Sequence, residues 1–257
     1  MGQYVALLDI LGFKDIINNN PHEEVVDLFK HFRIYVQMGL AKNKTTEGLN
    51  GRLTYDVRAS TLNSNIISDS LIFWTNDNKA SGLFEVIDCL HIFTTFCHNL
   101  PHIFLRGGIT YGDYYYENNG IIRGKDTFII HPIMVGKGLV DVYEIEKQLQ
   151  IAGCIITENA IEEAKGDGTS FFADNWDMFI DEKKIVKYEM PTKKGKMDSW
   201  TINWVRDLDR SDFKEIKDGF SSFNKRIDDV SVQEKIENTM AYFLYVKEHV
   251  YKKRVGN

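Results

Sequence analysis

The stretch YVALLDILGF, residues 4–13, decides how this chain is expected to fold. Its apolar run is short, nearly continuous and stopped by a glycine, which predicts a buried central strand that ends in a turn. Asp9 is the only charged residue in the run. Because side chains alternate along a strand, Asp9 is expected to share a face with Val5, Leu7 and Leu11. An ionised carboxylate on such a face is costly unless it is paired, hydrogen-bonded or bound to a cation.

Strand and helix patterns alternate on the C-terminal side of this run. The expected elements, in order, are a helix with apolar positions at 25–36, extended runs at 53–59 and 65–74 that form a hairpin around a turn at 60–64, a helix at 81–99 and a strand at 102–110. The resulting order, β-α-β-β-α-β over residues 4–109, is that of a ferredoxin-like split βαβ unit. The predicted fold class is therefore α+β.

The remaining sequence continues in a mixed pattern. We expect a tyrosine-rich hairpin through 113–116, a helix at 135–150, a strand at 154–157, a helix at 158–165, short strands over 171–204, and helices at 212–227 and 232–251. The region 166–257 would then be a C-terminal α/β extension that packs on the same domain as residues 1–165.

The composition is that of an ordinary globular protein, with 43% hydrophobic and 26% charged residues in a chain of 257. Its net charge of −6 gives no reason to expect nucleic acid or a membrane surface as a partner. Cys89, Cys97 and Cys154 lie in apolar stretches and are expected to be reduced core residues. With no signal-peptide pattern and no run of ~18 uncharged apolar residues, we expect a cytoplasmic protein without a membrane span.

A second aspartate interrupts an apolar run in NIISDSLIFW, residues 65–74. Alternation places Asp69 on a face with Ile67, Leu71 and Phe73. Two carboxylates that converge from neighbouring strands repel each other unless a divalent ion lies between them. Hard oxygen ligands of this kind suit Mg²⁺ that is shared with substrate phosphates. The alternative is that each aspartate caps a strand end or pairs with a buried arginine.

Four motifs, taken in order, resemble the class III nucleotide cyclase catalytic domain. They are Asp9-Ile10-Leu11-Gly12-Phe13, Ser68-Asp69-Ser70, Arg106-Gly107-Gly108-Ile109-x-x-Gly112, and Val135-Gly136-x-Gly138-Leu139-Val140 at the start of a helix. Within that superfamily the chain is most similar to the bacterial pyrimidine cyclases of anti-phage defence, which carry a comparable G-x-x-L-V-x-x-Y-x-x-E run. Here that run spans residues 136–146. The resemblance covers about residues 4–165 and implies a catalytic core at 1–165.

The resemblance also implies a site and a reaction. Asp9 and Asp69 would bind two Mg²⁺ or Mn²⁺ ions, with the Ile10 carbonyl as a further ligand. The residues that would hold the nucleotide are Leu11, Gly12 and Phe13, through their amides, together with Asn65 and Lys137. The ribose 3′-oxygen of UTP (or CTP, with uridylate cyclase favoured) would attack the α-phosphorus and release pyrophosphate. A homodimer with shared active sites would make this second messenger, which a separate effector protein would sense.

Departures from the family pattern leave alternatives open. Asn65 stands four positions before Asp69, where purine cyclases often carry Lys or Glu, and the second base-selecting position aligns near Ile133. Val140 and Glu144 stand where those families place an Asn and an Arg that stabilise the transition state. The candidates for the missing positive charge are Arg106, Lys137 and Arg123. The alternatives are a purine cyclase with an unusual pocket and an inactive nucleotide-binding module, and Arg106 could equally be a structural partner of a carboxylate.

Overall fold

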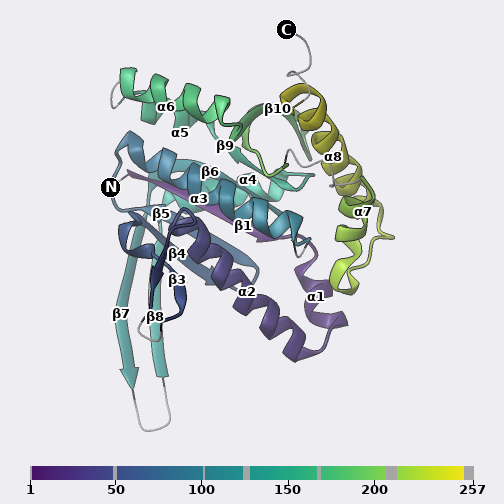
Figure 1. The fold of residues 1–257 in the computed structure, drawn as a ribbon, viewed down its shortest axis with the longest axis horizontal. Helices are drawn as coiled ribbons and strands as arrows, with labels where there is room; N and C mark the ends of the chain where they lie inside the picture. The colour runs from purple at the N-terminus through teal and green to yellow at the C-terminus, as the bar shows by residue number, and fades with distance from the viewer. Residues whose placement is uncertain are drawn as a thin grey trace.

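The computed structural model describes residues 2–48, 51–100, 102–123, 128–166, 169–206 and 213–251. Its centre is a seven-stranded sheet in the order β10-β11-β9-β6-β1-β5-β4 (Figure 1). The strands are β1 (Gly2–Ile10), β4 (Leu62–Ile67), β5 (Ser70–Thr75), β6 (Leu105–Asp113), β9 (Gly153–Ile156), β10 (Ile185–Thr192) and β11 (Gly195–Ile202). Neighbouring strands are antiparallel except β6 and β9, which run parallel.

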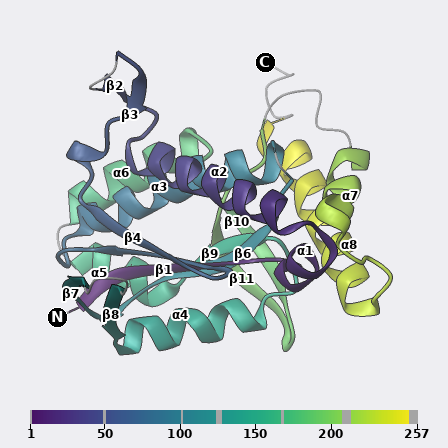
Figure 2. The ribbon, with the colours of Figure 1, turned by 90° about the horizontal axis from the view of Figure 1, so that it is seen from below.

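Helices cover both faces of this sheet (Figure 2). One face carries α2 (His22–Leu40) and α3 (Ala80–Asn99), and the other carries α4 (Lys137–Gln148). Alternate residues of β1 divide between the two faces: Leu8 packs in the core under α2 and α3, whereas Val5 and Leu7 pack with Val142 of α4. This alternation turns Asp9 toward α4, as expected. Leu11 lies beyond the strand and joins a third apolar cluster at the end of the sheet.

The first half of the chain has the predicted ferredoxin-like topology. Its elements follow in the order β1, α2, β4, β5, α3 and β6, and the four strands lie side by side as β6-β1-β5-β4. A short helix, α1 (Phe13–Asn19), connects β1 to α2. The central strand β1 is thus hydrogen-bonded on both sides, which explains why its run is almost wholly apolar.

A hairpin is present in this region, but it does not pair the predicted runs 53–59 and 65–74. The chain reverses at Ser68 and Asp69, so the continuous run 65–74 holds two strands, and the expected turn at 60–64 instead leads into edge strand β4. Ser68 adopts φ +56°, the left-handed conformation that a two-residue hairpin turn requires. Residues 53–59 form β3 (Leu53–Tyr55), paired with β2 (Thr45–Glu47), and then a 3-10 turn.

The segment after residue 166 differs from expectation at its start. A helix, α6 (Thr169–Asp181), occupies the first part of the region where short strands were expected. Phe172, Trp176 and Phe179 recur at helical spacing and pack around Phe84 of α3, so this is an amphipathic helix. It follows α5 (Glu158–Gly166) and precedes the hairpin β10–β11, which adds two strands to the sheet.

The C-terminal helices close one end of the molecule. They are α7 (Phe213–Ser221), η2 (Ser222–Asn224), α8 (Val230–Val246) and a π turn, η3 (Lys247–Tyr251). Phe220 of α7 stacks on Phe104 just before β6, with ring centroids 4.3 Å apart. Both views place α1 beside this end, although α1 comes from the opposite end of the sequence (Figures 1 and 2).

A two-stranded arm projects from the body of the protein (Figure 1). It consists of β7 (Tyr115–Arg123) and β8 (Phe128–Val135), which pair as one hairpin. Residues 113–116, where a tyrosine-rich hairpin was expected, instead join β6 to this arm. The base of the arm packs on β5 through Tyr116, whose ring centroid lies 4.7 Å from that of Trp74.

Helix α3 is long and apolar enough to cross a membrane by length and composition alone, with a mean hydropathy of 1.3. It carries Glu85 and Asp88, and 61% of its apolar window is buried inside the protein. Phe93, at its centre, packs between Phe32 of α2 and Phe73 of β5. Its apolar surface is thus used by the core.

Candidate functional site

Asp9 and Asp69 converge at one end of the central strand. Asp9 is the penultimate residue of β1, and Asp69 is the second residue of the two-residue turn between β4 and β5. The Ile10 N–H donates to the Asp69 carbonyl at 3.1 Å, which ties this turn to the end of β1. Asp69 is therefore on a turn and not on the strand face that alternation predicts, yet the two side chains lie within hydrogen-bonding reach.

The surroundings of Asp9 disfavour its charged form. Burial, the neighbouring Glu146 carboxylate and Asp69 together raise the pKa of Asp9 to about 7, and only the Arg106 guanidinium opposes them. A carboxylate with this environment is stabilised by any additional positive charge that reaches it.

Arg106 links Asp9 to helix α4. Its Nη2 atom lies 2.5 Å from Oε1 of Glu146 and 3.6 Å from Oδ2 of Asp9, and its Nη1 donates to the Leu149 carbonyl. Glu146 is 3% exposed, and burial raises its pKa while Arg106 lowers it. Asp9 and Glu146 thus share one guanidinium, and Asp69 adds a third carboxylate beside Asp9.

Glu146 is a site residue that sequence reasoning did not assign. One sequence signal was its place at the end of the run 136–146, where it matches the glutamate of the family pattern, although no function was assigned to it. Its spacing carries a second signal, because Glu146 follows the buried Val142 by four residues and so lies on the same inward face of α4. A carboxylate on the inward face of a helix needs a partner, and here that partner is Arg106.

A divalent cation fits the donor set at this end of β1. The carboxylates of Asp9 and Asp69 are hard oxygen ligands of the kind that Mg²⁺ prefers. Within the described ranges, no group of three or more His, Cys, Asp or Glu side chains is placed to hold a metal ion. Two carboxylates leave coordination places for a backbone carbonyl, water and phosphate oxygens, so the pair suits a cation that is shared with a bound phosphate.

The turn after β1 offers backbone donors beside the aspartates. Gly12 has φ +78°, the left-handed conformation that glycine adopts without strain. The Leu11 N–H donates to the Phe104 carbonyl at 2.9 Å and is already engaged. In the part of the chain that the structure describes, the N–H groups of Gly12 and Phe13 have no backbone partner. These two groups can each donate a hydrogen bond to a phosphate oxygen.

An apolar groove opens between Asp69 and helix α4. It has a volume of about 490 Å³, and Leu7 and Ile72 of the sheet form its floor. Val140 and Tyr143 of α4 form its wall and are 60% and 45% exposed. Two large apolar side chains that remain this open beside a polar centre mark an incomplete surface.

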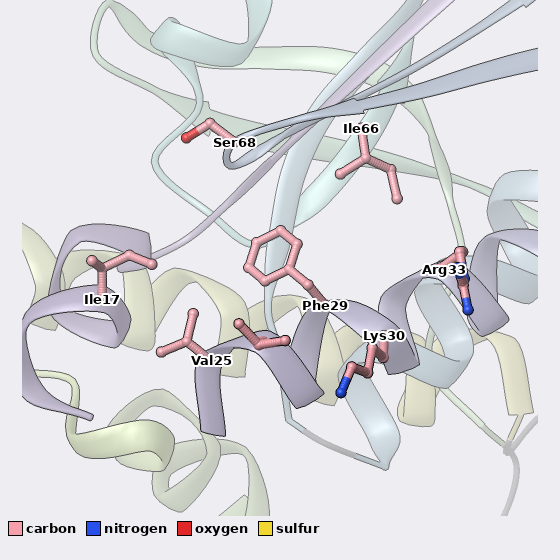
Figure 3. Close-up of a pocket in the computed structure, with 8 residues that line it drawn as sticks. Ile17, Val25, Phe29, Lys30, Arg33, Ile66 and Ser68 are labelled. Atoms are coloured by element: carbon pink, nitrogen blue, oxygen red, sulfur yellow. The ribbon is translucent and has the colours of Figure 1, made fainter. Parts of the chain in front are cut away.

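A separate cavity of about 480 Å³ lies on the opposite face of the β4–β5 hairpin, between α1 and α2 (Figure 3). It is mainly apolar: Val25 and Phe29 of α2 and Ile66 of β4 line it, with Ser68 at its rim. Ser68 lines this cavity and the groove beside α4, so the turn that carries Asp69 separates the two.

The other predicted site residues lie further from the aspartates. Asn65 stands opposite Ile72, on the α4 side of the sheet, and its Nδ2 is 3.8 Å from Sδ of Met134 in the arm. Lys137 lies at the start of α4, is 75% exposed and pairs with Asp141.

Lys137 and Arg123 were the other two candidates for the missing positive charge. Gly138, next to Lys137, packs against Gly112, at the opposite end of β6 from Arg106, so the fold does not bring Lys137 to the carboxylates of its own chain. The side chain of Arg123 lies outside the described residues. Glu144, in the place of the family's arginine, is exposed and 3.7 Å from Lys147.

No protein-family model and no curated protein matches this sequence. Solved structures do match. The dimeric guanylyl cyclase domain of the RhoGC fusion protein from the aquatic fungus Blastocladiella emersonii is 13% identical; the alignment covers 78% of this chain and 95% of that chain, with a TM-score of 0.51. A bacterial light-regulated adenylyl cyclase is 11% identical; the alignment covers 87% of this chain and 58% of that chain, with a TM-score of 0.50.

At these identities the similarity establishes the fold alone. The chain has the mixed α+β fold of class III nucleotide cyclase catalytic domains, which confirms the predicted fold class. The pyrimidine subtype and the role in phage defence stay predictions.

Proposed function

We propose that this chain is a nucleotide cyclase that converts UTP, or CTP, into the 3′,5′-cyclic monophosphate and pyrophosphate. The observation that carries the proposal is the convergence of Asp9 and Asp69 at the end of the central strand of a cyclase fold. The carboxylates of Asp69 and Glu146 beside Asp9 support it, because a bound cation would offset the repulsion among the three.

The chain's own groups divide the work around the nucleotide. Asp9, Asp69 and the Ile10 carbonyl would hold two Mg²⁺ or Mn²⁺ ions. When bound, such ions supply a Lewis acid for the ribose 3′-hydroxyl and neutralise phosphate charge. The N–H groups of Gly12 and Phe13 would donate to phosphate oxygens.

Arg106, which the Glu146 carboxylate orients, would place a guanidinium beside the same phosphates. The 3′-oxygen then attacks the α-phosphorus in line, and pyrophosphate leaves.

A second copy of the chain would complete the site. The groove beside Asp69 is apolar and open, and Val140, at one of the two α4 positions that the family uses for catalysis, lines one side of it. A partner subunit docked there would bring a second α4 to the nucleotide. Lys137 of the partner subunit could then approach phosphates that Lys137 of the same chain does not approach.

Asn65 supports a pyrimidine base. Its carboxamide offers one acceptor and two donors on the α4 side of the sheet. Ile133, at the second base-selecting position, is apolar and 42% exposed, so the pair of polar groups that selects a purine is missing. A small base that a single amide reads fits these two residues better.

The biological role follows from the resemblance alone. A cyclic pyrimidine nucleotide made during phage infection would act as an alarm signal, and a separate effector protein would sense it. An inactive nucleotide-binding module is the second candidate, because Val140 and Glu144 replace two family residues that stabilise the transition state.

The first experiment incubates the purified chain with Mn²⁺ and each of ATP, GTP, CTP and UTP, and identifies products by mass spectrometry. We expect one cyclic pyrimidine nucleotide from the wild type and none from Asp69→Asn, which keeps the shape of the side chain while removing its charge. A cyclic purine would contradict the pyrimidine assignment. No product from any nucleotide, with nucleotide binding retained, would favour the inactive module.

A further inference from the structure

A second cavity adjoins Asp9 on the side of the C-terminal helices. It has a volume of about 200 Å³ and lies over the turn after β1, between α1 and the segment that joins η2 to α8. Its charged lining residues are Asp9, Asp15, Arg106, Lys225, Arg226 and Lys235. Four cations therefore surround a small cavity that is continuous with the carboxylate site, and three of them come from the region after residue 166.

Lys225 is the most unusual of these cations. Its side chain is 7% exposed, and its Nζ atom is buried without a hydrogen-bond partner. Its aliphatic stem covers Gly12, because a Cβ at Gly12 would come within 2.7 Å of Cδ of Lys225. Burial lowers the pKa of Lys225 to about 8. Burying an ammonium group without a partner costs folding free energy. A bound anionic ligand would pair with the ammonium and reduce that cost.

The backbone on either side of Lys225 is held in place by α1. Asn20 donates from Nδ2 to the Phe223 carbonyl at 2.6 Å, and Asn19 donates to the Asn224 carbonyl at 2.7 Å. Phe223 and Asn224 have φ of +55° and +52°, so these bonds stabilise a conformation that side chains seldom adopt.

The residue after Lys225 is tied to the same helix. The Arg226 N–H donates to Oδ2 of Asp15 at 2.9 Å. The ammonium is thus positioned over the turn before any ligand binds.

The balance of charge in the cavity leaves two lysines uncompensated. Asp15 faces Arg226 at 3.3 Å, and Arg106 already faces Glu146 and Asp9. Lys235 donates to the Ser231 carbonyl and has no carboxylate partner among the described residues. Burial and the nearby Arg106 and Lys193 lower its pKa. A ligand with several negative charges is what this arrangement lacks.

We propose that Lys225, with Lys235 beside it, binds the β- and γ-phosphates of the nucleoside triphosphate and the pyrophosphate that the reaction releases. The cavity lies next to both Asp9 and the unpaired N–H of Gly12, so a polyphosphate chain can span the three. The C-terminal extension then forms part of the binding site, in addition to packing against the rest of the domain. The link to turnover rests on the proposed function, whereas the binding of polyphosphate does not.

The test measures binding of inorganic pyrophosphate in the presence of Mn²⁺ by titration calorimetry on the full chain. Lys225→Met keeps the stem over Gly12 and removes the charge. We expect about 10- to 100-fold weaker binding, the effect of one charge-assisted hydrogen bond. The unfolding midpoint should stay the same or rise, because an unpaired buried charge has gone. Lys235→Met should weaken binding as well, by a smaller factor.

Lys196→Met is the matched control, because Lys196 is 66% exposed on β11 and pairs with Glu189. It removes the same charge and should leave binding unchanged. Unchanged binding in Lys225→Met would overturn the inference, and so would weaker binding accompanied by a lower unfolding midpoint, which would indicate a packing role.

The measurement also separates the two proposals. If Lys225→Met loses pyrophosphate binding and the wild type makes no cyclic nucleotide, the phosphate site is supported and the proposed cyclase activity is contradicted. Cyclic nucleotide production with unchanged pyrophosphate binding would do the reverse.

Discussion

His98 shows how the packing around the site sets the ionisation of single residues. Its ring is 2% exposed, and its Nε2 accepts the Leu105 N–H at 3.0 Å, so the folded protein holds it neutral. Burial, with a smaller effect from the Lys225 charge, lowers the pKa of His98 from 6.5 to about 3. The unfolded chain therefore binds a proton at a pH where the folded chain does not, and acid favours unfolding through this residue.

We predict that His98→Gln makes the protein less sensitive to acid. The stabilising contribution of His98 is fully present above pH 6.5 and is lost as the pH falls from 6.5 toward about 3. Between about pH 7.5 and pH 5 the wild type should lose roughly 2 kcal/mol more unfolding free energy than the variant, whose amide oxygen can still accept the Leu105 N–H. Urea titrations of both proteins at both values measure this, and equal losses would contradict it.

The residues of the site differ in how far sequence could place them. Asp9 was predictable because a charge inside an apolar strand is a local signal. The convergence of Asp9 with Asp69 was predictable because β1 and β5 belong to one split unit, although the turn at Ser68 and Asp69 was hidden in a continuous apolar run. The position of Lys225 was not predictable, because no pattern near it in the sequence indicates that its aliphatic stem covers Gly12.

Among the elements, α4 has two faces with different roles. Val142 and Glu146 point into the protein, whereas Val140 and Tyr143 stay open beside the groove. The helix predicted at 135–150 is present as Lys137–Gln148. Helix α6 was mistaken for strands because aromatic residues are common in strands, although Phe172, Trp176 and Phe179 recur at helical spacing.

We predict that Val140→Asp abolishes dimerisation without unfolding the subunit. Val140 is 60% exposed, so the change removes little packing within one chain and should alter the unfolding free energy by no more than about 0.5 kcal/mol. A charge in an apolar contact between subunits costs far more. Sedimentation velocity should give a dimer for the wild type and a monomer for the variant.

Val230→Asp is the control for that experiment, because Val230 is 83% exposed on α8 and does not line the groove. It should sediment like the wild type. A dimer that survives Val140→Asp would place the subunit interface elsewhere.

At the scale of the whole molecule, the region after residue 166 is continuous with the rest. Strand β11 pairs with β9, and the apolar cluster at the end of the sheet joins Phe104 and Ile155 to Trp204 and Tyr242. The ferredoxin-like half was predictable because the order of its strand and helix patterns is that of a known unit, although β1 pairs with β6 far along the chain. The closure of the sheet end was not, because no comparable order of patterns indicates which segments meet there.

We predict that the chain unfolds in a single cooperative transition. Three of the four tryptophans, Trp176, Trp200 and Trp204, lie after residue 166, whereas the helices and strands are spread along the whole chain. Urea unfolding followed by tryptophan fluorescence and by far-ultraviolet circular dichroism should therefore give coincident curves. A fluorescence transition at lower urea would mean that the C-terminal region unfolds on its own.

The contact between Asp15 and Arg226 also has a consequence for how the protein is made. It spans 211 residues of sequence, which a ribosome takes roughly 10–40 s to add. Once residue 69 has been added, the nascent chain carries both aspartates and the Gly12 turn but still lacks Lys225, whose stem covers that glycine. A chain released before that point would retain the aspartates without that wall, so the cavity over the Gly12 turn forms only after residue 225 has been added.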